Sequence, residues 1–174
     1  MLRIIGGEFR SRLLKSVPGD TTRPTPDRLR ESLFSILTPD LEGATFVDAY
    51  AGTGAVGLEA VSRGAARAIL IEKDPAAATI CKANIEALKV ADRARLVKAK
   101  AAAVIADYPA DILFIDPPYP LEKEYALCLN AAQKHGLVIA QHASRFQLEE
   151  SYGALTRYRT LRQGDNTLSF YRQA

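Results

Sequence analysis

The sequence predicts an α/β protein with a largely parallel β-sheet and helices on both faces. From residue 45 onward, short apolar runs alternate with segments in which apolar residues recur at helical spacing. This alternation is typical of parallel strands joined by crossover helices. Residues 154–174 change pattern: apolar and polar side chains alternate on both sides of "GDN" (164–166), which predicts an antiparallel hairpin that closes the sheet.

Each element of this body follows from a local pattern. Strands are expected at 44–49, 67–72, 94–99, 111–116 and 136–141, and helices at 55–64, 75–90, about 100–108 and 121–136. Pro75 suits the first turn of its helix, because a proline there loses no helical hydrogen bond. Gly64 and Gly136 suit helix ends.

Residues 1–40 stand apart as a small basic extension. "LRIIGG" and "SRLLKS" can pair as a hairpin around Gly6 and Gly7. In "TTRPTPDRLRESLFSIL" we expect Thr25 to cap a helix just before Pro26, with an apolar face made of Leu29, Leu33, Phe34 and Leu37. We therefore divide the chain into a hairpin-plus-helix extension, 1–40, and a sheet domain, 41–174.

The composition is that of an ordinary soluble globular protein. With 174 residues, 48% hydrophobic and 25% charged, the chain is large enough for one domain with a sizeable core. No apolar stretch is long enough to span a bilayer, and the first residues show no secretory signal. Cys81 and Cys128 lie far apart without metal-ligand spacing, so we expect buried thiols, no metal site and a cytoplasmic location.

The positive charge is concentrated near the start of the chain. The whole sequence has a net charge of +3, whereas residues 1–30 hold seven basic and three acidic side chains, a net charge of +4. A basic arm on a nearly neutral body suggests a contact with phosphates. A solvated surface hairpin is the alternative interpretation.

The stretch "VDAYAGTGAVG" (47–57) follows the first expected strand and opens a helix. Gly52, Gly54 and Gly57 match the G-x-G-x-x-G pattern of dinucleotide-binding proteins. Asp48 favours a different ligand, since a carboxylate repels a pyrophosphate but attracts the amino group and the sulfonium of S-adenosylmethionine. A structural glycine turn with an incidental aspartate is the remaining alternative.

Glu72 ends the second expected strand, 20 residues after Gly52, where a carboxylate can accept hydrogen bonds from both ribose hydroxyls of an adenosine. NAD-binding proteins use the same device, so Glu72 does not choose between the two cofactors. After the third strand, residues 98–101 supply no acid or amide. The group that reads the adenine therefore stays open, with Asp107 as one candidate.

The fourth strand ends in "IDPPYP" (115–120). An exocyclic amine of a nucleobase is a weak nucleophile, so it must be held in line with the methyl group that it attacks. Asp116 can accept one N–H and the Pro117 carbonyl the other, while the two prolines restrict the backbone that aims them. Tyr119 offers a ring on which an extruded base can stack. An ordinary strand exit is the alternative for this stretch taken alone.

In this order along the chain, these stretches resemble the class I methyltransferases with a [DNS]-P-P-[YFW] motif. More narrowly, the chain resembles the RsmD-type 16S rRNA guanine-N2 methyltransferases through "RIIGGEFRSRLL", "RPTPDRLRESLFSIL", "DAYAGTGAVGLEAVSRGA" and "GDNTLSFY". The resemblance implies a seven-stranded Rossmann-like sheet with a terminal antiparallel hairpin. It implies S-adenosylmethionine as donor and a guanine of 16S rRNA as acceptor, within the 30S subunit or an assembly intermediate. We expect a monomer.

The resemblance also implies roles for individual residues. The residues expected to line the donor site are Asp48, Ala49, Gly52, Gly54, Glu72 and Lys73. The residues expected to hold the target base are Asp116, Pro117 and Tyr119. The candidates for RNA contacts, some of which could instead brace the active site, are Arg10, Arg12, Arg23, Thr25, Arg28, Arg30 and Pro118.

Other functions remain open from the sequence. The same chemistry could act on adenine N6, although a separate DNA-reading domain does not fit in 174 residues. It could act on a protein amide, although such methylases are expected to carry Asn where this chain has Asp116. A nicotinamide-dependent oxidoreductase would use the same glycine pattern, and a non-catalytic RNA-binding module would leave the filled catalytic positions unexplained.

Overall fold

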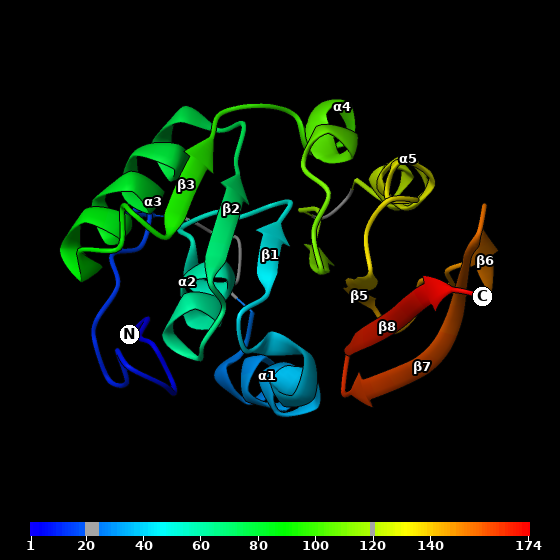
Figure 1. Ribbon diagram of the computed structural model, residues 1–174, viewed down its shortest axis with the longest axis horizontal. Helices are drawn as coiled ribbons and strands as arrows, with labels where there is room; N and C mark the ends of the chain where they lie inside the picture. Colours follow the sequence, from blue (N-terminus) through cyan, green and yellow to red (C-terminus); the bar gives the residue numbers. More distant parts are fainter. Residues whose placement is uncertain (20–24, 119–120) are drawn as a thin grey trace.

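The computed structural model describes residues 1–19, 25–118 and 121–174, and Arg23 and Tyr119 lie outside these ranges. It contains one sheet in the order β3-β2-β1-β4-β5-β8-β7-β6 (Figure 1). The strands are β1 Thr45–Asp48, β2 Arg67–Ile71, β3 Ala94–Val97, β4 Ile112–Ile115, β5 Leu137–Ala143, β6 Ser151–Tyr152, β7 Leu155–Gln163 and β8 Asn166–Gln173. The five strands that the sequence predicts and the terminal hairpin are thus confirmed.

Strands β1 to β5 are parallel to their neighbours, and β8 joins the sheet antiparallel to β5. The β7–β8 hairpin turns at Gly164, which has a φ of 58°. The expected number of seven strands is one too low, because the two-residue β6 adds a short antiparallel pair with the start of β7. A strand of two residues is too short to show the alternation of apolar and polar side chains from which strands are predicted.

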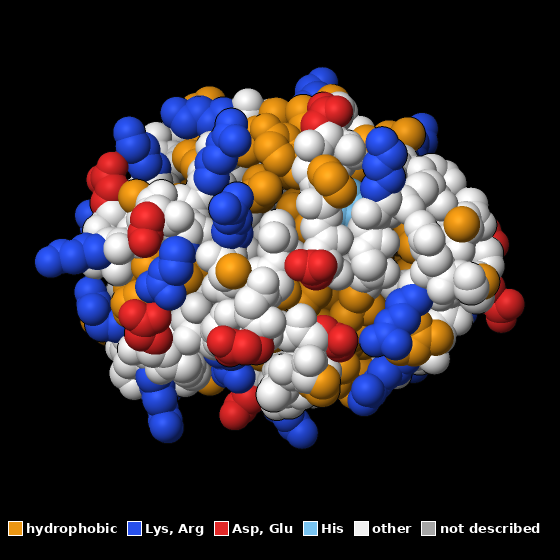
Figure 2. Space-filling model, in the orientation of Figure 1, with side chains coloured by type: hydrophobic (Ala, Val, Ile, Leu, Met, Phe, Trp, Pro, Cys, Tyr) orange, Lys and Arg blue, Asp and Glu red, His pale blue; other side chains and the backbone are white. Residues whose placement is uncertain are grey.

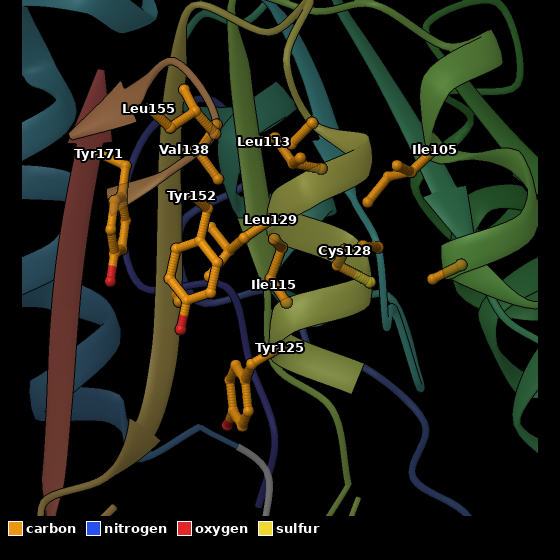
Figure 3. Close-up of a cluster of buried hydrophobic side chains, with 14 of the residues drawn as sticks. Ile105, Leu113, Ile115, Tyr125, Cys128, Leu129, Val138, Tyr152, Leu155 and Tyr171 are labelled. Carbon is orange, nitrogen blue, oxygen red and sulfur yellow. The ribbon is translucent and has the colours of Figure 1, made fainter. Parts of the chain in front are cut away.

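Helices cover both faces of the sheet, as expected. Their bounds are α1 Asp27–Leu41, α2 Ala55–Ser62, α3 Pro75–Leu88, α4 Ala101–Val104, the 3₁₀ helix η1 Ile105–Asp107 and α5 Lys123–Ala131. Helices α1, α2 and α3 pack on one face, whereas α4, η1 and α5 pack on the other (Figure 1). On the second face, Tyr125, Cys128 and Leu129 of α5 lie against β4 and β5 (Figure 3). Among the described residues, no helix is long and apolar enough to cross a membrane.

The helix predicted in the extension is α1, and its apolar face is buried as expected: Leu29, Leu33, Phe34 and Leu37 are each at most 1% exposed. The expected cap is wrong. The N-cap position is Pro26, without a side-chain cap, and the Thr25 hydroxyl instead points to Gln141 of β5, with 3.4 Å between the two oxygens. Burial of the helix face, rather than capping, fixes where α1 lies.

The first fourteen residues fold back on themselves, joined by one antiparallel bridge between Arg3 and Leu13 and not by regular strands. Their anchor is Glu59 of α2, which is fully buried and accepts hydrogen bonds from the backbone N–H groups of Ile5 and Gly6 at 2.8 and 2.9 Å. Ile4 is buried in the same cluster as α2 and α3. The extension therefore shares its core with the sheet, and the boundary at residue 40 stays a prediction.

Candidate active site

Three carboxylates lie at the carboxyl ends of three adjacent parallel strands. Asp48 ends β1, Glu72 follows β2 and Asp116 follows β4, in a sheet where β1 pairs with both β2 and β4. Ligands of open α/β sheets bind at this edge, where the chain order reverses. The three groups are near enough that Asp116 and Glu72 both raise the pKa of Asp48.

Asp48 is the most buried of the three, with 1% of the residue exposed. Its Oδ2 accepts a hydrogen bond from the Gly57 N–H at 3.1 Å, while its Oδ1 has no hydrogen-bond partner among the described residues. Burial, and then the two neighbouring carboxylates, raise the pKa of Asp48 to about 7, against the opposing effect of the Gly57 and Tyr50 N–H groups. A buried acceptor without a partner is costly, so this oxygen indicates a ligand that donates to it.

The glycine loop leaves room for such a ligand. Gly52 has a φ of 56°, and a side chain added there would meet nothing within 4 Å. Gly54, with a φ of 89°, stands at the N-cap of α2. Gly57 serves packing instead, because an added Cβ would lie 2.0 Å from Leu70 Cδ2 of β2. The first two glycines therefore shape the loop, and the third lets α2 approach the sheet.

Glu72 holds the loop in place. Its Oε2 accepts a hydrogen bond from the Gly52 N–H and its Oε1 from the Asp74 N–H, both at 2.8 Å. Each carboxylate oxygen has a second acceptor position, so these bonds leave Glu72 able to bind ligand hydroxyls. Asp74 caps α3 by accepting from the Ala77 N–H, as a residue before a helical proline often does.

A second support of the loop was not predicted from the sequence. The Asn84 side chain of α3 donates to the Thr53 carbonyl at 2.9 Å and to the Lys15 carbonyl at 3.1 Å, and its Oδ1 accepts from the Lys15 N–H at 2.8 Å. One buried amide thus ties the loop to the N-terminal extension. The sequence offered one sign of this contact, which is the polar Asn84 within the apolar pattern of the α3 helix.

Asp116 lies just beyond β4 and is partly exposed. Burial raises the pKa of Asp116 to about 7, and a hydrogen bond with the Thr25 side chain opposes that rise. Thr25 is therefore a neighbour of both Asp116 and Gln141. The next residue, Pro117, is buried, as a rigid part of the site wall.

A partly buried group of polar side chains joins the glycine loop to α5. The Tyr50 hydroxyl lies 2.6 Å from Glu124 Oε2 and donates to it, and it lies 3.1 Å from Cys128 Sγ. One residue further along α5, Tyr125 donates to the Gln141 carbonyl at 2.6 Å. The loop after β1 and strand β5 are therefore fixed to the same helix. Sequence spacing could not reveal these contacts, which depend on the packing of α5.

The remaining residues predicted for the site differ in their exposure to solvent. Ala49 is buried and donates its N–H to the Phe114 carbonyl at 2.9 Å, so it joins β1 to β4. Lys73 and Pro118 are exposed at the same edge. The exposed candidates for RNA contacts are Arg10, Arg12 and Arg28.

The RNA contact predicted for Arg30 is wrong. Its side chain is 0% exposed and donates to the Arg3 carbonyl at 2.6 Å and to Asp27 at 3.1 Å. Its Nε also lies 3.8 Å from Glu59 Oε1. Arg30 instead holds the extension against α1 and α2.

The region after β3 leaves adenine recognition open. Lys100 is the N-cap of the short helix α4, and Asp107 is exposed in η1. Among the residues that the structure describes, no group of His, Cys, Asp or Glu side chains is arranged to hold a metal ion. The three carboxylates make this edge of the sheet acidic, which suits a cation.

Comparison with known proteins shows which family the chain resembles. Residues 2–172 match the family model described as "Conserved hypothetical protein 95". The chain is 31% identical to the Bacillus subtilis protein named "Putative rRNA methyltransferase YlbH", over 99% of both chains. It is 45% identical to the Escherichia coli K12 protein named "Ribosomal RNA small subunit methyltransferase D", over 68% of this chain and 60% of that protein.

A solved structure is also similar over nearly the whole chain. The protein titled "Putative methyltransferase yhhF from Escherichia coli" superposes with a TM-score of 0.85 at 33% identity, covering 99% of this chain and 98% of that one. The similarity therefore includes the extension and the terminal hairpin.

Proposed function

The chain belongs to the RsmD-type family of rRNA methyltransferases, and from this membership we propose that it transfers a methyl group from S-adenosylmethionine to the N2 amine of a guanine in 16S rRNA. The observation that carries the proposal is Asp48 Oδ1, a buried carboxylate oxygen without a described partner at the glycine loop. A cationic donor that carries an ammonium group supplies what this oxygen lacks.

The residues present fit the methyl donor. Asp48 would accept from its amino group, and Glu72 would accept from ribose hydroxyls through the acceptor positions that its two backbone bonds leave. The open space over Gly52 lets the donor approach the backbone closely. When bound, S-adenosylmethionine supplies a methyl group on a positively charged sulfur.

Asp116 and Pro117 would position the acceptor amine. The carboxylate of Asp116 accepts one N–H of the amine and the Pro117 carbonyl the other, so the nitrogen lone pair is directed toward the methyl group. Thr25 restrains the Asp116 side chain in this orientation. Tyr119, which lies outside the described residues, is proposed to stack with the guanine.

Asp116 can also take the proton that the reaction releases. An amine that gained a methyl group would become positively charged and acidic, and it would release one proton. With a pKa of about 7, Asp116 is a matched acceptor for that proton near neutral pH. No other base in contact with the amine is required.

The partners and location follow from the proposed substrate. We propose that the protein acts as a monomer in the cytoplasm on 16S rRNA within the 30S subunit or an assembly intermediate. The exposed Arg10, Arg12 and Arg28 then contact RNA phosphates, and Arg23 of the same segment is proposed to join them.

Two measurements test this function. Calorimetric titration is expected to show binding of S-adenosylhomocysteine and not of NADH; the reverse result would refute the methyl-donor site. The variant Asp116→Ala is expected to lose transfer from labelled S-adenosylmethionine by at least about 100-fold while binding S-adenosylhomocysteine normally. Retained transfer would exclude the proposed role of Asp116.

A further inference from the structure

The β7–β8 hairpin is a second basic region of the chain. Residues 155–174 contain four arginines and one aspartate, a net charge of +3, which equals that of the whole protein. Figure 2 shows Lys and Arg side chains gathered over β7 and β8, beside an apolar surface. The hairpin therefore concentrates charge far from the N-terminal extension in sequence.

The turn of this hairpin lies at the same edge of the sheet as the candidate active site. Asn166, the first residue of β8, pairs with Ala143 at the carboxyl end of β5. Two residues earlier in β5 is Gln141, the hydrogen-bond partner of Thr25. The hairpin turn is thus a near neighbour of the residues that hold Asp116.

A cleft of about 430 Å³ lies between this turn and the start of α1. Its walls carry two exposed arginines, Arg28 from α1 and Arg162 from β7, together with the polar Gln163 and Asn166. Gln163 donates to Ser32 of α1 at 2.6 Å, which fixes one wall to the other. The two walls of the cleft are therefore held together, and its rim is positively charged.

The electrostatics of the cleft favour an anion. Helix α1 begins here without a side-chain cap, so the positive end of its dipole adds to the two arginines. The acid in its first turn, Asp27, is paired with the buried Arg30 at 3.1 Å. Asp165, between Gly164 and Asn166 in the hairpin turn, is the other acid beside the cleft in sequence. Its backbone carbonyl accepts a hydrogen bond from the Ser144 N–H.

Beyond the cleft, the same hairpin carries a stacked aromatic and basic array. The Arg172 guanidinium lies 4.4 Å from the centre of the Tyr158 ring, and Arg159 lies 5.9 Å from the centre of the Phe170 ring. Tyr158 is 46% exposed. Arginines interleaved with an exposed aromatic ring suit phosphates and bases better than an acidic protein surface.

We propose that the cleft between α1 and the β7–β8 turn binds the RNA backbone next to the target guanine, through Arg28 and Arg162. The inference rests on the proposed function for the identity of the RNA. Because Thr25 adjoins Pro26 on the cleft wall, a phosphate held there lies beside the nucleotide held at Asp116. The β7–β8 hairpin then extends the bound RNA surface toward Tyr158.

The test compares the double variant Arg28→Gln/Arg162→Gln with the control Arg67→Gln/Lys82→Gln. The control removes the same charge from two exposed positions, in β2 and α3, away from the cleft. Binding of unmethylated 16S rRNA and of 30S subunits is measured against salt concentration, with S-adenosylhomocysteine affinity as a check on the fold. The cleft variant is expected to bind RNA roughly tenfold more weakly, with a salt slope smaller by about 2, while the control and the donor affinity stay unchanged.

Three results would overturn the inference. The first is an unchanged RNA affinity of the cleft variant, and the second is an equal loss of affinity in the control. The third is a weaker affinity for 30S subunits with an unchanged affinity for naked rRNA, which would identify a ribosomal protein as the partner. Failure of the proposed function is distinct, because the wild-type protein would then transfer no methyl group to guanine whatever the variants bind.

Discussion

The substitution Asp48→Asn separates the stability of the fold from the function of the site. Asn is nearly the same shape, and its Oδ1 can still accept from the Gly57 N–H. The substitution removes a carboxylate that is 1% exposed and has one oxygen without a described partner. We therefore expect the variant to lose donor binding and to gain stability at alkaline pH.

The magnitude follows from the pKa of Asp48, which is 3.8 ordinarily and about 7 in the folded protein. Between these values the folded protein keeps a proton that the unfolded chain has lost, so the stability of wild type falls as pH rises from about 4 to 7 and is then level. A difference of about 3 pKa units corresponds to about 4 kcal/mol. The charge of Asp116 is one of the causes that raise the pKa of Asp48, so the difference between variant and wild type includes the coupling of these two acids.

The assay is thermal unfolding of both proteins at pH 4 and pH 8 without added donor, together with calorimetry of S-adenosylhomocysteine. The free energy of unfolding of the variant relative to wild type is expected to rise by about 4 kcal/mol between the two pH values, and its melting temperature by roughly 2–4 °C per kcal/mol. A difference that does not change with pH would refute the assigned burial of charge. Normal binding of S-adenosylhomocysteine by the variant would refute the role of Asp48 as donor ligand.

Two further substitutions test the supports of the site. Thr25→Val removes the hydrogen bond that lowers the pKa of Asp116, so the acid limb of the rate–pH profile is expected to move to higher pH, with a several-fold loss of kcat at pH 7; an unmoved limb, as expected for the control Thr38→Val, would contradict this. Glu59→Ala leaves Arg30 buried without its anchor carboxylate, so we expect a loss of about 3–5 kcal/mol of stability in chemical denaturation. The exposed Glu86→Ala is the control, and equal effects would show that Glu59 has no special role.

The sequence was sufficient for the five parallel strands, the terminal hairpin and the order of the site residues. Alternation of apolar runs with helical periods placed every parallel strand, because a buried strand must be apolar throughout. Asp48, Glu72 and Asp116 could be grouped because each ends a strand, and parallel strands end at one edge.

Long-range side-chain contacts could not be predicted in the same way. Thr25 looked like a helix cap, yet its side chain forms a hydrogen bond with Asp116, 91 residues later in the chain. Arg30 looked like one more exposed charge, yet its fixed place on the buried side of α1 pairs it with Glu59. Both depend on how α1 docks on the sheet, which local patterns do not specify.

We propose that this site methylates a guanine amine of 16S rRNA. The most direct measurement is methyl transfer from labelled S-adenosylmethionine to 30S subunits from a strain that lacks the protein, followed by nuclease digestion and mass spectrometry. We expect one new N2-methylguanosine, which is absent when Asp116→Ala is used. A methyl group on adenine, or no transfer to rRNA at all, would contradict it.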